Sequence, residues 1–240
     1  MVAIPAYLRA RLRDAKSVTV LTGAGVSAAS GVPTFRGPAG LWRRFRPEDL
    51  ATPDAFARDP RLVWEWYAWR RERIACCQPN AAHVALAEWS RRYPRWTLIT
   101  QNVDGLHERA GTAGVLRFHG SIWELSCWDR CGAAPWADDR VPLPEMPPRC
   151  PSCGGLARPA VVWFGEPIDP GVFARCAKAL TCDLFFVVGT SSVVYPAAGL
   201  TEAAAARGAF TVEINPDATE ASDRVDLSLR APAEEVLPLL

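Results

Sequence analysis

Four short apolar segments, each followed by polar residues or glycine, recur along the chain. They lie at 18–22, 96–100, 183–188 and 210–214. Runs of this length are typical of strands in a parallel sheet that is buried on both faces. Because segments with helical periodicity separate them, the pattern predicts an α/β fold with a mostly parallel sheet covered by helices on both sides.

Two helices are expected between the first two of these strands. The segment 62–76 carries Trp64 and Trp66 at helical spacing, and such an aromatic stripe usually packs in a core. The segment 81–92 has the periodicity of a helix with one buried face, and His83 lies on that face. We therefore expect His83 to be a packing residue rather than a catalytic one.

The first strand runs into a glycine-rich turn, Gly23-Ala24-Gly25. Glycines here would let backbone N–H groups approach an anion, and a helix opening near Val26 would favour phosphate at its N-terminus. The spacing fits the dinucleotide-binding pattern with Ala28 in the third glycine position, but an ordinary strand-to-helix turn can have the same spacing. The acidic ribose ligand that dehydrogenases carry about 20 positions further on is missing.

Polar residues also follow the later strands, at the edge where open α/β sheets bind ligands. A plain turn with an Asx-type cap is the alternative for the first group of them. Those that we single out as candidate ligand contacts are Gln101, Asn102, Asp104, His119, Gly189, Thr190, Ser191, Asn215 and Asp217.

Composition excludes some classes of function. With 240 residues, 49% hydrophobic and 22% charged, the chain can bury a full core as one domain, or as a domain with a small appendage. A formal net charge of +1 gives no basis for a nucleic-acid partner. No apolar run approaches the roughly 20 residues that span a bilayer, and the first residues lack the apolar region of a signal peptide. We expect a cytoplasmic protein without a membrane partner.

Four of the eight cysteines form two close pairs. Paired spacing in a chain without a secretion signal points to a metal site rather than to disulfides. Four thiolates in two pairs predict one structural, tetrahedral Zn²⁺, and the alternative from another class of function is a zinc ribbon that binds nucleic acid or protein. The expected ligands are Cys127, Cys131, Cys150 and Cys153.

The segment GAGVSAASGVPTFRG, at 23–37, resembles the NAD-binding signature of the sirtuins, the Sir2-like protein lysine deacylases. The resemblance continues through most of the chain, to Asn215. It implies an NAD-dependent enzyme that removes acyl groups from lysine side chains of proteins and gives nicotinamide, O-acyl-ADP-ribose and free lysine. It also implies a Rossmann-like large lobe of residues 1–38, 81–124 and 158–240, and a smaller zinc-binding lobe of residues 39–80 and 125–157.

The resemblance assigns roles to single residues. His119 lies between a phenylalanine and a glycine, as in the catalytic motif of sirtuins, which implies that it is the general base. Gln101, Asn102 and Asp104 match positions that face the nicotinamide end of NAD, and Asn215 matches a contact to the adenosine ribose. The implied cofactor-binding residues are Gly23, Ala24, Gly25, Ser27, Thr34, Phe35, Arg36, Trp42, Gln101, Asn102, Asp104, Gly189, Thr190, Ser191, Asn215, Asp217 and Ala233.

The segment VVWFGE, at 161–166, resembles the sirtuin strand that pairs with the substrate peptide through main-chain hydrogen bonds. Pairing of this kind reads little of the peptide sequence, so selectivity is expected in the acyl pocket. The implied substrate-binding residues are Tyr67, Arg70, Val161, Trp163, Phe164 and Gly165.

Tyr67 and Arg70 are three residues apart and share one face of the expected helix. They resemble the pair that marks the sirtuin class acting on succinyl-, malonyl- and glutaryl-lysine, in which the guanidinium binds the distal carboxylate and the phenol adds a hydrogen bond. Ala51 matches the small residue that makes room for the longer acyl chain. The neighbouring Arg71 and Arg73 are expected to be solvated.

Other activities are open to the same cofactor pocket. The alternatives are a protein that is mainly a deacetylase, a mono-ADP-ribosyltransferase and, more remotely, an unrelated NAD-dependent dehydrogenase. A monomer is expected, while the sequence leaves the physiological targets open.

Overall fold

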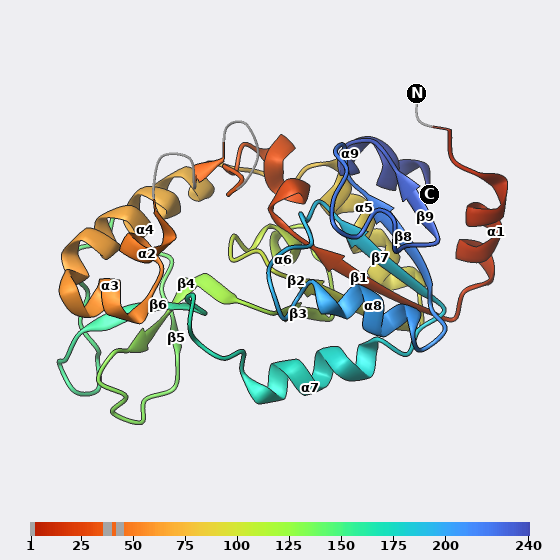
Figure 1. Ribbon diagram of the computed structural model, residues 1–240. Coiled ribbons are helices and arrows are strands. Elements are labelled where there is room, and N and C mark those ends of the chain that lie inside the picture. Colours follow the sequence, from red (N-terminus) through yellow and green to blue (C-terminus); the bar gives the residue numbers. More distant parts are fainter. Residues whose placement is uncertain (1–2, 36–39, 42–45) are drawn as a thin grey trace.

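The computed structural model describes residues 3–35, 40–41 and 46–240, which form two lobes (Figure 1). One lobe contains a six-stranded sheet in the order β3-β2-β1-β7-β8-β9, and every adjacent pair of its strands is parallel. The prediction of an α/β fold with a parallel sheet is confirmed. Its strands are β1 (Ser17–Thr22), β2 (Arg95–Thr100), β3 (Val115–Arg117), β7 (Leu184–Val188), β8 (Phe210–Ile214) and β9 (Leu227–Leu229).

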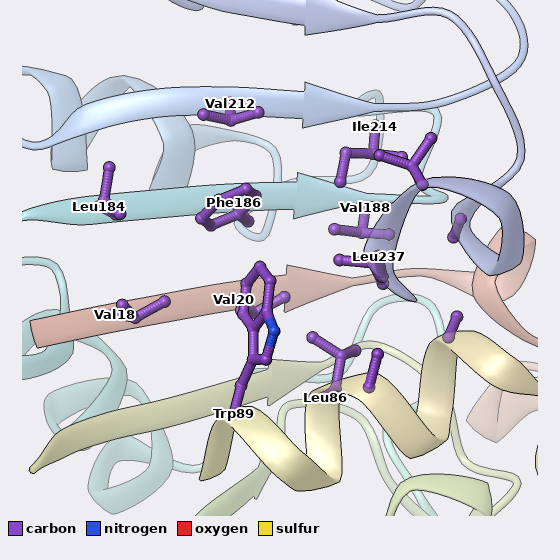
Figure 2. Close-up of a cluster of buried hydrophobic side chains, with 14 of the residues drawn as sticks. Val18, Val20, Leu86, Trp89, Leu184, Phe186, Val188, Val212, Ile214 and Leu237 are labelled. Atoms are coloured by element: carbon purple, nitrogen blue, oxygen red, sulfur yellow. The ribbon is translucent and has the colours of Figure 1, made fainter. Parts of the chain in front are cut away.

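Both faces of this sheet are covered. On one face α5 (Ala81–Arg92) packs with α1 (Ala6–Asp14) and α9 (Ala233–Val236). Figure 2 shows Trp89 of α5 against this face, with its ring centre 5.1 Å from that of Phe186. On the other face α7 (Pro170–Ala179) and α8 (Gly199–Ala205) cover side chains such as Phe185 and Val187. Because neither face of the sheet meets water, every residue of β1 and β7 is buried, and β7 is apolar along its whole length.

The second lobe joins an antiparallel sheet to a group of helices. The sheet has the order β5-β4-β6, and its strands are β4 (Gly120–Cys127), β5 (Trp136–Ala137) and β6 (Ala157–Val161). The helices are α2 (Pro47–Leu50), α3 (Pro53–Arg58) and α4 (Pro60–Ala75). Both parts contribute to a single cluster of buried side chains, which includes Phe56, Trp64 and Leu125. The exact lobe boundaries given above stay a prediction.

The turn after β1 differs from the expected α-helix. Residues Ala24–Ser30 form a 3₁₀-helix, η1, which ends at Gly31. Its first hydrogen bond already has three-residue spacing, from the N–H of Val26 to the carbonyl of Gly23. The N–H of Gly25 instead donates to Gly189, which lies far along the chain. The N–H of Gly25 lies in the first turn, where a helix leaves its N–H groups without an internal partner, and the tertiary contact with Gly189 satisfies it.

Arg71 is not solvated, contrary to expectation. It is 1% exposed, and its Nη2 donates to Oδ1 of Asp138 at 2.9 Å and to the backbone oxygen of Arg140 at 3.2 Å. Arg73 is exposed, as expected. The ion pair between Arg71 and Asp138 is buried and joins α4 to the segment after β5, so it is a tie within the second lobe.

The short helix α6 (Leu106–Arg109) follows the end of β2. Among the described residues, no helix is both long and apolar enough to cross a membrane.

Replacing Arg71 by methionine should lower the free energy of unfolding by about 1–3 kcal/mol, because Asp138 loses a buried hydrogen-bond partner while Arg140 still pairs with its other carboxylate oxygen. Urea unfolding measures this change. Arg73→Met is the matched control on the same helix and should change stability by no more than about 0.5 kcal/mol. Adding Asp138→Leu to Arg71→Met should restore part of the loss. Equal stabilities for the two single variants would contradict this account.

Candidate functional site

A cavity of about 710 Å³ lies at the carboxyl ends of the parallel strands, and residues of both lobes line it. From β1 the chain continues to β2 and β3 on one side of the sheet, and later strands are added on the other side, beginning with β7. The strand order therefore reverses between β1 and β7, and open α/β sheets bind ligands at such a switch point. The loops that follow these two strands, 23–25 and 189–191, both line the cavity.

The glycines of these loops permit an unusually close approach of two backbones. The N–H of Gly25 donates to the carbonyl of Gly189 at 2.8 Å, and a Cβ on Gly25 would lie 2.7 Å from that oxygen. A Cβ on Gly23 would lie 2.6 Å from Cβ of Thr190, while its N–H donates to Val188. The N–H groups of these two glycines are thus occupied within the chain. The expectation that backbone N–H groups of this turn approach an anion stays a prediction, and it now concerns the other amides of the turn. Glycine is needed here because the loops pack together.

Side-chain hydrogen bonds tie further strand ends to Thr190. Nε2 of Gln101, beyond β2, donates to Oγ1 of Thr190 at 3.1 Å. Nδ2 of Asn215, beyond β8, donates to the backbone oxygen of Thr190 at 2.9 Å. All three residues line the cavity. The side-chain amides of Gln101 and Asn215 and the hydroxyl of Thr190 thus hold one another in place. They form a polar side of the cavity, which we call its wall.

Ser27 and Asp104 lie behind the wall rather than on it. Oγ of Ser27 donates to Oδ2 of Asp104 at 2.8 Å and accepts a hydrogen bond from Nδ2 of Asn102 at 3.2 Å. Burial raises the pKa of Asp104, although hydrogen bonds from Leu106 and Ser27 oppose the shift. Asn102 does line the cavity, and its hydrogen bond to Ser27 connects it to the buried pair of Ser27 and Asp104.

His119 is the one histidine of the chain that lines the cavity. Its Nδ1 lies 3.1 Å from the carbonyl oxygen of Gln101, and only a protonated Nδ1 can bond to a carbonyl. Burial lowers the pKa of His119, while the bond to Gln101 opposes the shift. A neutral ring with this tautomer has an unprotonated Nε2, which can accept a proton.

His83 and His107 are buried behind the cavity, and the burial of His83 agrees with its expected packing role. Burial lowers the pKa of His83 to about 4, so its ring is neutral at ordinary pH. Nε2 of His107 lies 3.0 Å from Oγ1 of Thr22. Burial also holds the pKa of His107 well below its usual value.

Helix α4 places Tyr67 and Arg70 at the end of the cavity that the second lobe forms. The guanidinium carbon of Arg70 lies 4.9 Å from the ring centres of both Phe35 and Trp66, and 5.6 Å from that of Tyr67. Arg70 is only 7% exposed, and within the described part of the chain it has no hydrogen-bond or ion-pair partner. Burial lowers its pKa, but a guanidinium stays charged in proteins.

The segment after β6 forms another part of the wall. The N–H of Val162 donates to the backbone carbonyl of His119 at 3.0 Å, and the N–H of Phe164 donates to the backbone carbonyl of Ala51 at 2.9 Å. The N–H of Trp163 donates to Oε2 of Glu166 at 2.8 Å. These amides are therefore occupied, and main-chain pairing with a peptide would use the remaining backbone groups.

The two cysteine pairs come together in the second lobe. All four Sγ atoms lie within 4.8 Å of one another, with 3.6 Å between Cys127 and Cys153 and 3.7 Å between Cys131 and Cys150. A tetrahedron with Zn–S bonds of about 2.3 Å has edges of about 3.8 Å. The sulfurs thus fit one tetrahedral Zn²⁺ with no open coordination position. Cys127 belongs to this set of four sulfurs, with three residues between it and Cys131 in the sequence.

Comparison with known proteins identifies the family. The model of the Sir2 family matches residues 23–196. The chain belongs to the Sir2 family. An "NAD-dependent protein deacylase 2" of Pyrobaculum aerophilum is 50% identical over 230 residues, covering 95% of this chain and 91% of that protein. An "NAD-dependent protein deacylase" of Aquifex aeolicus is 49% identical over 218 residues, covering 90% of each chain.

A solved structure confirms the architecture of this Sir2-family protein. The crystal structure of a Sir2 homolog–NAD complex has 46% sequence identity and a TM-score of 0.92, and the alignment covers 99% of this chain and 93% of that one. The cavity fits such a cofactor, because its volume suits a ligand of that size and fixed amide and hydroxyl groups line its wall. The four sulfurs likewise fit the structural zinc.

Most of the expected site residues of this Sir2-family protein line the cavity. Arg36 and Trp42 fall outside the described residues. Ser27 and Asp104 lie behind the wall, as described above. The expected residues on the wall are Gly23, Ala24, Gly25, Thr34, Phe35, Tyr67, Arg70, Gln101, Asn102, His119, Val161, Trp163, Phe164, Gly165, Gly189, Thr190, Ser191, Asn215, Asp217 and Ala233.

The cavity also has lining residues that were not among the expected ones. Trp66 was expected only to pack in the core, because an aromatic stripe on a helix carries no sign of which ring borders a cavity. Ile168 comes from a loop and Glu234 from the first turn of α9, and neither belongs to a motif. Additional lining residues are Ala28, Val103, Glu166, Thr219 and Pro232.

Substitution of one zinc ligand, Cys150→Ser, should abolish stoichiometric zinc binding and unfold the second lobe, because a structural site supplies folding free energy. Metal analysis by mass spectrometry and thermal unfolding measure the two effects. Cys76→Ser, an exposed cysteine outside the cluster, is the matched control and should keep both zinc and stability. A folded, active protein without zinc would contradict the assignment.

Proposed function

We propose that this protein is an NAD-dependent protein lysine deacylase that prefers acidic acyl groups, namely succinyl, malonyl and glutaryl. The products would be nicotinamide, O-acyl-ADP-ribose and free lysine, with NAD supplying the ADP-ribosyl acceptor of the acyl group. Membership of the Sir2 family and the names of the relatives support the reaction. The buried guanidinium of Arg70 on the cavity wall, which has no hydrogen-bond or ion-pair partner among the described residues, supports the acyl preference.

His119 is the proposed general base. Its hydrogen bond to Gln101 fixes the ring and leaves Nε2 to accept a proton from a ligand hydroxyl. The pKa is lowered by burial, so the neutral form that a base requires predominates at neutral pH. Asn102 and Gln101 line the same part of the cavity and would orient the ligand there.

The end of the cavity that Tyr67 and Arg70 line, here called the acyl end, carries a charge that favours an anion. Arg70 is the one cationic side chain among the described lining residues. Glu166 also lines the cavity, but both of its carboxylate oxygens accept hydrogen bonds from Arg158, at 2.5 and 2.8 Å. The negative charge of Glu166 is therefore compensated within the chain, while no described residue forms an ion pair with Arg70.

A carboxylate on the acyl group would pair with Arg70 through the planar fork of guanidinium donors. An acetyl group has no such partner and would leave the guanidinium buried without one. A site built to hydrogen-bond a substrate group discriminates against the analogue that lacks it, because the polar groups of the site stay unpaired. Ala51 lines the cavity with a small side chain, which leaves room for a longer acyl group.

The sequence also gives expectations about the partners and location of the protein. A net charge of +1 gives no reason to expect a nucleic-acid partner. Cytoplasmic location and a monomeric state remain the expectations drawn from the sequence. The proposed substrates are acylated lysines in proteins, without strong dependence on the flanking sequence.

His119→Ala should lower turnover of NAD and a succinylated peptide by at least about 100-fold, the typical loss when a general base is removed. Mass spectrometry of the products measures nicotinamide and O-succinyl-ADP-ribose, and unchanged zinc content and thermal stability are the control. In the unmodified protein, kcat/KM should fall on the acid side with a midpoint below pH 6.5, because protonation of a base of lowered pKa abolishes its role. Near-normal turnover of the variant, protein-bound ADP-ribose or NADH would contradict this proposal.

Arg70→Met should lower kcat/KM for a succinyl-lysine peptide by about 10- to 150-fold, the range for a lost hydrogen bond to a charged group. The same change should alter kcat/KM for the matched acetyl-lysine peptide by less than about threefold. Arg73→Met is the control, since Arg73 is exposed on the same helix. Equal efficiencies on the two peptides in the unmodified protein, or a persisting preference for succinyl in Arg70→Met, would refute the acyl preference.

A further inference from the structure

Trp163 makes a hydrogen bond inside the acyl end of the cavity. Its Nε1–H donates to the hydroxyl oxygen of Tyr67 at 2.9 Å. Both side chains line the cavity and are only 2% exposed. An indole N–H can donate but never accept, so the direction of this bond is fixed by chemistry.

The bond determines what the Tyr67 hydroxyl can offer a ligand. Its oxygen already accepts from Trp163, and no described residue accepts its proton. Burial raises the pKa of Tyr67, so the hydroxyl keeps that proton at neutral pH. The phenol therefore presents a donor to the cavity beside the donors of Arg70.

Trp163 is itself held firmly in place. The guanidinium carbon of Arg158 lies 3.5 Å from its ring centre, and Glu166 both pairs with Arg158 and accepts the backbone N–H of Trp163. The ring of Phe56 packs against it with centres 5.4 Å apart. These contacts oppose any rotation of the indole that would release the Tyr67 hydroxyl.

We propose that Trp163 is a positioning residue for acyl selection, which acts by filling the acceptor side of the Tyr67 hydroxyl so that only its donor faces the ligand. The consequence is that the Tyr67 hydroxyl and the Arg70 guanidinium both present donors to the acyl group, an arrangement that selects a carboxylate. This inference rests on the proposed preference for acidic acyl groups.

The test removes the N–H and keeps an aromatic ring. Trp163→Phe should lower kcat/KM for the succinyl-lysine peptide by about 3- to 10-fold, the range for one hydrogen bond, mainly through a higher KM. The acetyl-lysine peptide should change by less than about twofold, because its acyl group does not reach these donors. Tyr67→Phe should produce a similar loss of succinyl selectivity, and adding Trp163→Phe to it should cause no further loss.

Trp128→Phe is the matched control. Trp128 belongs to the same aromatic group, with its ring centre 6.4 Å from that of Trp163, and its indole N–H has no hydrogen-bond partner in the described part of the chain. The same ring change at Trp128 should leave the ratio of succinyl to acetyl efficiency unaltered.

The outcomes separate this inference from the proposed function. If the unmodified protein does not prefer succinyl, the proposed acyl preference fails and the role of Trp163 fails with it. If the unmodified protein prefers succinyl while Trp163→Phe keeps the full ratio, only the role of Trp163 is refuted. Equal losses on both peptides, or a loss that adds to that of Tyr67→Phe, would show a general structural role instead. Should Trp163→Phe not fold, an unchanged ratio in Tyr67→Phe would also refute the inference.

Discussion

The loops that follow β1 and β7 meet at a distance that leaves no room for side chains. The N–H of Gly25 reaches the carbonyl of Gly189 at 2.8 Å, where a Cβ would collide with that oxygen. This contact places Thr190 beside the end of β1, and Thr190 in turn accepts hydrogen bonds from Gln101 and Asn215. A single approach of two backbones thus orders the ends of four strands, and the polar wall of the cavity depends on it.

The two ends of the cavity are built on different physical principles. At the sheet edge, side-chain amides donate hydrogen bonds to the hydroxyl and backbone oxygens of Thr190 and form a polar surface. At the acyl end, Tyr67 and Arg70 come from α4, and Trp163 comes from the segment after β6. There Arg158 and Glu166 pair with each other, while no described residue forms an ion pair with Arg70. In the proposed function, reaction chemistry and acyl selection would depend on different elements and could vary separately.

A buried polar layer supports the wall from behind. Nδ1 of His83 accepts the backbone N–H of Asn80, so its Nε2–H points to Ser27 at 3.3 Å. Ser27 then donates to Asp104, and burial keeps His83 neutral. Each member of this chain has a partner, which is the condition under which buried polar groups order a site instead of destabilising it.

The sequence by itself determined the features that depend on neighbours along the chain. Apolar runs predicted the strands because burial on both faces demands them, cysteine spacing predicted the zinc ligands, and helical periodicity put Tyr67 and Arg70 on one face. It could not assign Arg71, whose buried partner Asp138 is 67 residues away, nor the bond that joins Tyr67 to Trp163 across 96 residues. Only the tertiary structure decided these, because charge pairing and hydrogen-bond direction depend on which distant groups folding brings together.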